Sequence, residues 1–76
     1  MLKVSVTYNR PDNILVQDKY KPLVEACRTM AHFTPEMEQL HNELMADITH
    51  ATGVHIGMGE GEIFSAEIDG ITVIEL

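Results

Sequence analysis

Hydrophobic and polar positions alternate strictly at the start of the chain, over residues 2–8, Leu-Lys-Val-Ser-Val-Thr-Tyr. A period of two is typical of a strand with one buried face. The apolar face of this strand would carry Leu2, Val4, Val6 and Tyr8. Residues 9–13 contain proline, asparagine and aspartate, which favour a turn. Residues 14–17, Ile-Leu-Val-Gln, are then a short second strand or an extended lead-in to a helix.

The apolar spacing changes to three or four residues after position 18, which predicts a helix over 19–33. Asp18 can cap its start, and Pro22 is tolerated in a first turn. The apolar stripe of this helix would consist of Leu23, Ala26, Cys27, Met30 and Phe33. Because Cys27 falls on the stripe, we expect it to be a small buried hydrophobic side chain rather than a nucleophile.

A second helix is predicted from Pro35 to about Thr52. Thr34 is a favourable N-cap, Pro35 suits the first helical position, and Gly53 suits the position just after the helix. The predicted inward face carries Met37, Leu40, Leu44, Ile48 and Ala51, flanked by His41 and Met45. We expect His41 to be packed and hydrogen-bonded at the rim of this face.

The period returns to two after Gly53. Residues 54–58 alternate as Val-His-Ile-Gly-Met, and residues 62–68 and 71–76 flank Asp69-Gly70. Asp-Gly supplies the positive φ angles of a two-residue hairpin turn. This turn pairs Ile68 with Ile71, Ala66 with Val73 and Phe64 with Glu75. The core face would then hold Phe64, Ala66, Ile68, Ile71 and Val73.

These elements predict one domain over residues 1–76 with an α+β fold. We expect an antiparallel sheet of four or five strands with a two-helix layer on one face, in the order β-(β)-α-α-β-β-β. The single cysteine excludes an internal disulfide and a cysteine-rich zinc site. The last strand, with Ile71, Val73 and Ile74, is apolar on both faces. Such a strand is either central in the sheet or, if it lies at an edge, invites pairing, so we expect a homodimer or a covering partner.

Charge is distributed unevenly along the chain. All five basic residues lie within the first 28 positions, which carry a formal charge of +2, whereas the remainder carries −9 with no lysine or arginine. Direct nucleic-acid binding through this acidic part is disfavoured because phosphate contacts need cations. An acidic surface instead suits a basic partner protein, or serves only solubility.

The predicted second helix carries Glu36, Glu43, Asp47 and His50, which fall within an arc of roughly 60°. Glu43, Asp47 and His50 are candidate ligands for a divalent metal, since oxygen and imidazole donors suit several such ions. The alternative is a solvated acidic flank in which His50 complements the helix dipole. Glu36, Glu43 and Asp47 are also candidate partner-binding residues. No cofactor other than a divalent metal is indicated.

The run Gly57-Met58-Gly59-Glu60-Gly61 resembles a phosphate-binding loop only superficially, because it lacks the lysine and the serine or threonine and precedes no helix. Alternating glycines can instead let another backbone approach a strand closely. Gly57, Gly59 and Glu60 are therefore further candidate partner-binding residues. A flexible strand end is the alternative.

Three functional hypotheses follow. The first is a small acidic module that binds and modulates, or inhibits, a larger protein with a basic surface, including as a nucleic-acid mimic. The second is a metal- or small-ligand-binding protein. The third is a small oligomeric enzyme with a site shared between subunits, since one 76-residue chain has little room for a closed pocket. No apolar run is long enough to span a membrane, and no signal-peptide pattern opens the chain, so a cytoplasmic location is expected.

Overall fold

The computed structural model describes residues 1–9, 11–57 and 61–75. It confirms the α+β class. Four antiparallel strands form one sheet in the order β2-β1-β3-β4. The elements are β1 (Leu2–Thr7), β2 (Asp12–Val16), the 3-10 helix η1 (Asp18–Tyr20), α1 (Lys21–Thr29), α2 (Pro35–Thr52), β3 (Ser65–Ile68) and β4 (Ile71–Glu75).

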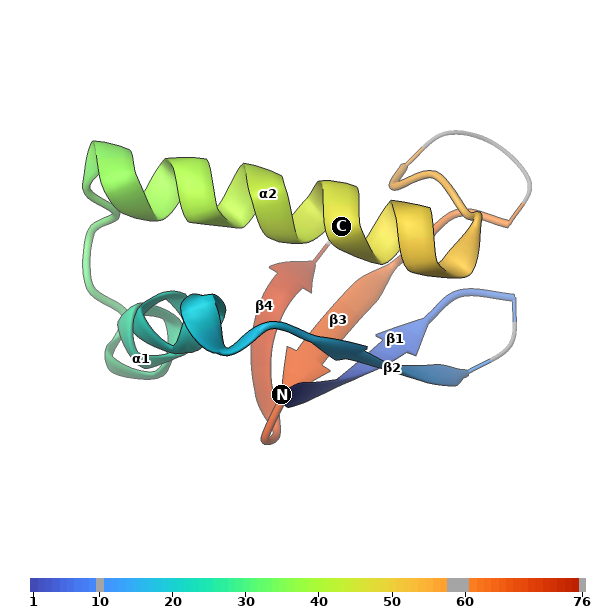
Figure 1. The fold of residues 1–76 in the computed structure, drawn as a ribbon, viewed down its shortest axis with the longest axis horizontal. Helices are drawn as coiled ribbons and strands as arrows, with labels where there is room; N and C mark the ends of the chain where they lie inside the picture. The colour runs from blue at the N-terminus through green and yellow to red at the C-terminus, as the bar shows by residue number, and fades with distance from the viewer. Residues whose placement is uncertain (10, 58–60, 76) are drawn as a thin grey trace.

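The two helices cover one face of the sheet, as predicted. Helix α2 runs along the long axis of the molecule and α1 lies at one end of it, near β4 (Figure 1). Neither helix has the length and apolarity that a membrane span needs, within the part of the chain described. The fully buried core between the layers consists of Val4, Val6, Tyr20, Leu23, Leu44, Ile48, Ile63, Ala66 and Ile68.

Strand β1 lies in the middle of the sheet and shows the predicted alternation. Val4 and Val6 are buried, whereas Lys3, Ser5 and Thr7 are exposed. The strand registers extend this division across the sheet. The face opposite the helices carries Lys3, Ser5, Thr7, Asn13, Leu15, Ser65, Glu67, Thr72 and Glu75. This open face is polar except at Leu15, whose side chain is 61% exposed.

Helix α1 is shorter than the predicted range of 19–33. It ends at Thr29 because Met30 adopts the left-handed conformation, with φ 56°. The Met30 N–H donates to the Cys27 carbonyl (3.3 Å) and the Ala31 N–H to the Ala26 carbonyl (3.0 Å). This pair of bonds is the Schellman motif, which normally uses glycine at the left-handed position. Met30 is consequently 91% exposed instead of lying on the apolar stripe.

Replacing Met30 with glycine is expected to stabilise the protein. A non-glycine residue in the left-handed region costs about 1 kcal/mol or more, and the exposed side chain supplies no packing to offset that cost. The free energy of unfolding should rise by about 1 kcal/mol and Tm by about 4–8 °C. Thermal unfolding measures this, with Met30→Ala as the matched control, since it removes the side chain and keeps the strain. Equal stability of the two variants would contradict the interpretation.

Helix α2 has the predicted boundaries. The Thr34 hydroxyl accepts a hydrogen bond from the Met37 N–H (3.3 Å), Pro35 occupies the first turn, and Gly53 closes the helix with φ 72°. Leu44 and Ile48 are fully buried, whereas Ala51, predicted to face inward, is exposed. The fully buried side chains that anchor α2 in the core are therefore Leu44 and Ile48, one turn apart.

The Asp69-Gly70 turn has the predicted left-handed angles, φ 52° and 77°, and Ile68 pairs with Ile71. Beyond this pair the predicted register is wrong. A bulge follows the Glu67–Thr72 pair, so Ala66 lies opposite Ile74 rather than Val73, and Ser65 rather than Phe64 lies opposite Glu75. The bulge adds one residue to β4. As a result, consecutive Val73 and Ile74 are both buried, with 5% and 3% exposure.

Residues 54–57 do not form the predicted strand. Val54 and Ile56 are half-buried and His55 and Gly57 exposed, as the alternation predicts, but the only pairing described there is an isolated parallel bridge between Ile56 and Ile63. Gly57 and Gly61 have φ angles of 72° and 84°, which turn the chain away from an extended course. Met58 and Gly59 lie outside the described residues.

The placement of Phe64 also differs from the prediction. Phe64 is 45% exposed, whereas its neighbour Ile63 is fully buried. The Phe64 N–H donates to the Thr7 carbonyl (2.8 Å) just before β3 begins. Ile63, which lies outside the strand, therefore fills the core position that the hairpin register assigned to Phe64.

Candidate functional site

The acidic flank predicted for the second helix is a continuous feature of α2. Because residues 35–52 form one unbroken helix, the spacing of Glu36, Glu43, Asp47 and His50 does place them on one flank. That flank lies on the β2 side, since Asp47 and His50 line a depression together with Val16 of β2. The sequence therefore predicted the row correctly but not what it meets.

The middle of this row meets the segment that precedes α1. The buried Tyr20 hydroxyl donates a hydrogen bond to Asp47 Oδ2. The Lys19 ammonium lies 3.7 Å from Glu43 Oε2 and 5.2 Å from the centre of the Tyr20 ring. Burial, followed by the hydrogen bond and the charge of Asp47, holds the pKa of Tyr20 well above its usual range, and the charge of Glu43 adds to this.

Glu36, at the other end of the row, has a local role at the start of α2. Hydrogen bonds from its own backbone N–H and from the Thr34 side chain hold the pKa of the Glu36 carboxyl below its usual value. This carboxylate is fully exposed. It stays ionised near neutral pH and complements the positive end of the helix dipole.

The metal hypothesis receives no geometric support. No group of three or more histidine, cysteine, aspartate or glutamate side chains in the described ranges is placed to hold a metal ion. Glu43 and Asp47 face different neighbours, the Lys19 ammonium and the Tyr20 hydroxyl. Glu43, Asp47 and His50 as metal ligands stay a prediction from sequence spacing alone.

A depression of about 230 Å³ lies between the end of β2 and the acidic flank of α2. Its lining combines apolar groups with one carboxylate and one imidazole: Met1, Leu15, Val16, Gln17, Asp47 and His50. Sequence reasoning found Asp47 and His50 but missed Leu15. A signal was available, because Leu15 interrupts the alternation of β2 with an apolar residue at an outward position.

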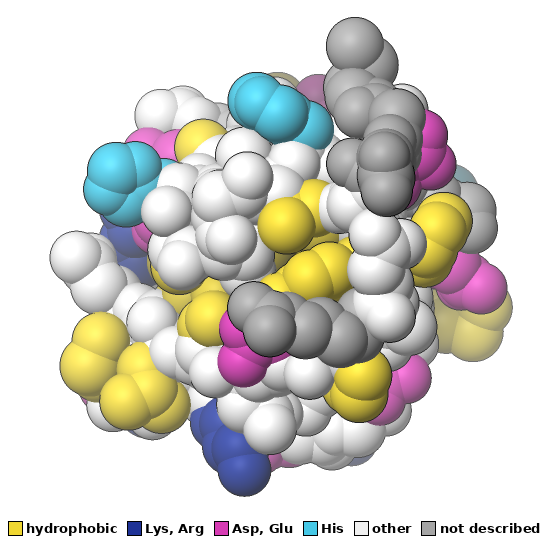
Figure 2. Space-filling model, turned by 90° about the vertical axis from the view of Figure 1, so that its right-hand side faces the viewer, with side chains coloured by type: hydrophobic (Ala, Val, Ile, Leu, Met, Phe, Trp, Pro, Cys, Tyr) yellow, Lys and Arg dark blue, Asp and Glu magenta, His cyan; other side chains and the backbone are white. Residues whose placement is uncertain are grey.

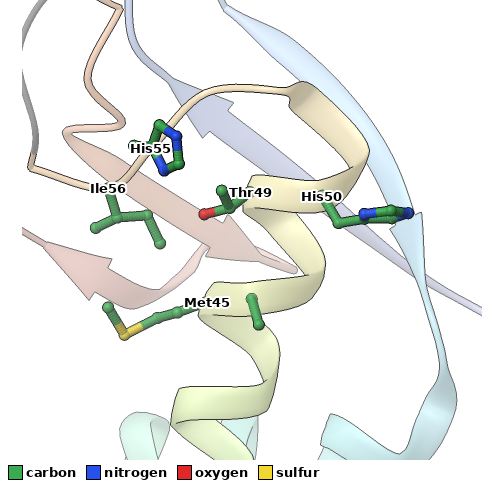
Figure 3. A pocket seen from close by; sticks show the side chains of 6 residues that line it. Met45, Thr49, His50, His55 and Ile56 are labelled. Carbon is green, nitrogen blue, oxygen red and sulfur yellow. The ribbon is translucent and has the colours of Figure 1, made fainter.

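A second depression, of about 440 Å³, lies next to the first along α2, and His50 lines both. At this end of the molecule, hydrophobic side chains are visible in the middle of the face (Figure 2). Met45, Thr49, His55 and Ile56 gather on one side of the helix, whereas the His50 ring projects away from them (Figure 3). Gly57 follows this lining in sequence. Gly59 and Glu60, the other predicted partner-binding residues here, lie outside the described residues.

The two edges of the sheet differ. The β4 edge carries the bulge at Val73, and His41 Nε2 lies 3.1 Å from the Val73 carbonyl, so the imidazole donates there if Nε2 carries the proton. A bulge and a covering side chain both protect an edge from pairing. The apolar side chains of β4 pack inside the protomer, so the homodimer expected from them stays a prediction without support from this edge. The β2 edge has no bulge in its pairing with β1.

Cys27 is half-buried on α1, and burial raises the pKa of its thiol. That setting is the opposite of what a reactive thiolate needs. Searches of protein-family models, of curated proteins and of solved structures found no match to this chain. The candidate site therefore rests on the chain's own geometry.

Proposed function

We propose that this protein is a small acidic interaction module that binds a larger protein through that protein's basic surface, with the α2 flank Glu36, Glu43 and Asp47 as the contact. The observation that carries the proposal is an excess of exposed carboxylates. Within residues 1–9, 11–57 and 61–75, ion pairs are described at Asp18, Glu25 and Glu43. The exposed carboxylates at which these ranges show no ion pair are Glu36, Glu38, Asp47, Glu67, Asp69 and Glu75.

The internal contacts of the flank leave it available to a partner. The side chains of Lys19 and Glu43 are 45% and 42% exposed. A salt bridge of this kind contributes only about 0–1 kcal/mol, so a partner's lysine or arginine can replace Lys19 at small cost. Asp47 is also exposed, and the Tyr20 hydroxyl bonds only one of its two oxygens.

Binding would modulate the partner by occupying its cationic surface. From Glu36 to Asp47 the row rises about 16 Å along the helix at 1.5 Å per residue. A rigid row of carboxylates can fill a groove that otherwise holds nucleic-acid phosphates, because both present negative oxygen acceptors to lysine and arginine. Inhibition by such mimicry is the specific form of modulation that we propose.

The test is selection of a random peptide library on the immobilised protein. Wild type should enrich peptides rich in lysine and arginine. The triple variant Glu36→Gln, Glu43→Gln, Asp47→Asn should bind them at least about tenfold more weakly, equivalent to about 1.4 kcal/mol. The matched control is Glu67→Gln, Asp69→Asn, Glu75→Gln, which removes the same number of charges from β3, its turn and β4. Enrichment without basic residues, or equal loss in both variants, would refute the proposal.

A further inference from the structure

The acidic flank of α2 stands directly beside the unprotected edge of the sheet. Of the two edge strands, β4 is bulged and has His41 against a carbonyl, whereas β2 pairs with β1 in an uninterrupted register from Leu2–Val16 to Val6–Asp12. An edge without such protection is a template for another strand.

The hydrogen bond of Asn13 indicates which residues of β2 face outward. The Asn13 N–H donates to the Asp12 side-chain Oδ1 (2.8 Å), from which we infer that it faces away from β1. Backbone groups on an antiparallel strand face the neighbouring strand and the outside at alternate residues. Leu15, two residues further on, therefore shares the outward orientation. Its N–H and carbonyl face away from β1, and its side chain is 61% exposed.

The depression at the end of β2 supplies side-chain contacts for an added strand. Leu15 and Val16 line it from the strand, and Asp47 and His50 line it from α2. An apolar side chain of an added strand can pack against the exposed Leu15. A lysine or arginine beside it can reach the Asp47 carboxylate, with Glu43 one helical turn further along the flank.

We propose that an extended, basic segment of the partner protein adds to the sheet as a fifth strand beside β2, with Leu15 as its central contact and Asp47 as its charge contact. The proposal rests on the proposed function, since it specifies how the basic partner is held. Main-chain hydrogen bonds supply affinity in strand addition, and alternate side chains supply specificity. A second copy is disfavoured as the occupant because each chain carries a net charge of −7.

Leu15→Pro tests the strand addition. Proline removes the Leu15 N–H, which β1 does not use, and an outward edge position tolerates it. Ile14 is already extended, as the residue before proline must be. Leu15→Thr is the control, because it loses the apolar side chain but keeps the N–H. The probe is a basic peptide enriched by the library selection. Leu15→Pro should weaken its binding at least about tenfold, and Leu15→Thr by much less.

The second measurement is amide hydrogen exchange of the wild-type protein with and without that peptide, which decides the matter even if Leu15→Pro fails to fold. Protection of the Leu15 amide is expected, and unchanged exchange there would overturn strand addition. If the peptide depends on the acidic flank but binds Leu15→Pro and Leu15→Thr equally, strand addition is wrong and the proposed function stands. If no basic peptide is enriched, both fail. A wild-type dimer that Leu15→Pro makes monomeric would place a second copy at β2 and overturn the proposal.

Discussion

Replacing Tyr20 with alanine is expected to cost about 3–5 kcal/mol, the range for removing a fully buried aromatic side chain. Tyr20, the last residue of η1, is completely buried in the core, and its hydroxyl donates a hydrogen bond to Asp47 of α2. A domain of this size has about 0.05–0.15 kcal/mol of stability per residue. The variant should therefore be largely unfolded or lose most of its stability in urea denaturation.

Tyr20→Phe separates the ring from the hydroxyl. The variant keeps the buried ring, and water can replace the hydroxyl as the hydrogen-bond donor to the exposed Asp47. We therefore expect the free energy of unfolding to fall by only about 1 kcal/mol near neutral pH. A cost for Tyr20→Phe close to that of Tyr20→Ala would mean that the hydroxyl, not the ring, dominates. Asp47→Asn keeps an acceptor for the hydroxyl and should cost less than Tyr20→Ala by a wide margin.

The same residue makes stability depend on alkaline pH. The pKa of Tyr20 is raised in the folded state by burial and by the negative Asp47, whereas an unfolded tyrosine has a pKa of about 10. A raised pKa means that the stabilisation is fully present below pH 10 and is lost as the pH rises above that value. Wild type should therefore lose stability above pH 10 more steeply than Tyr20→Phe. Parallel pH profiles of the two proteins would contradict the buried hydrogen bond.

Ile63 and Phe64 give the second large effect, because sequence and structure assign opposite roles to them. Ile63 is fully buried and Phe64 is 45% exposed. Ile63→Ala should cost about 2–5 kcal/mol, and Phe64→Ala about 1 kcal/mol or less. The pattern of the hairpin predicts the reverse order, since it places Phe64 on the core face.

Urea denaturation of the two variants side by side measures the difference, and each serves as the control for the other. The Ile63 N–H also donates to the His55 carbonyl (3.3 Å). Ile63 therefore links the start of the segment between α2 and β3 to its end. Ile63→Ala should therefore also speed amide exchange at residues 54–57. A larger loss of stability for Phe64→Ala would contradict the bulge, because it would place Phe64 in the core as the regular hairpin register predicts.

The features predicted correctly from sequence are those with local causes. Thr34, Pro35 and Gly53 set the ends of α2 through contacts within one turn. Asp69-Gly70 sets the hairpin through its own φ angles. The acidic row on α2 follows from helix geometry alone. For the same reason, the strict alternation of Val4 and Val6 with polar residues was enough to identify β1 and its buried face.

Tertiary contacts decided the rest. The end of α1 is an exception, because the Schellman motif at Met30 is local; no residue in the sequence signals it, since methionine rather than glycine takes the left-handed position. The bulge in β4 lets Val73 and Ile74 both reach the core, which no strictly alternating pattern can express. Likewise, the Thr7 carbonyl, far from Phe64 in sequence, receives its N–H at the point where Ile63 turns inward.

The candidate site divides in the same way. The sequence by itself determined an acidic chain with a row of carboxylates on one helix, because charge and helical period are properties of the residues. Only the tertiary structure decided that Tyr20 would meet Asp47 across 27 positions and that Leu15 would lie at an unprotected edge beside them. Such contacts depend on how the strands and helices pack against one another. Packing brings together residues that lie far apart in the chain, and their separation in sequence does not predict that they touch.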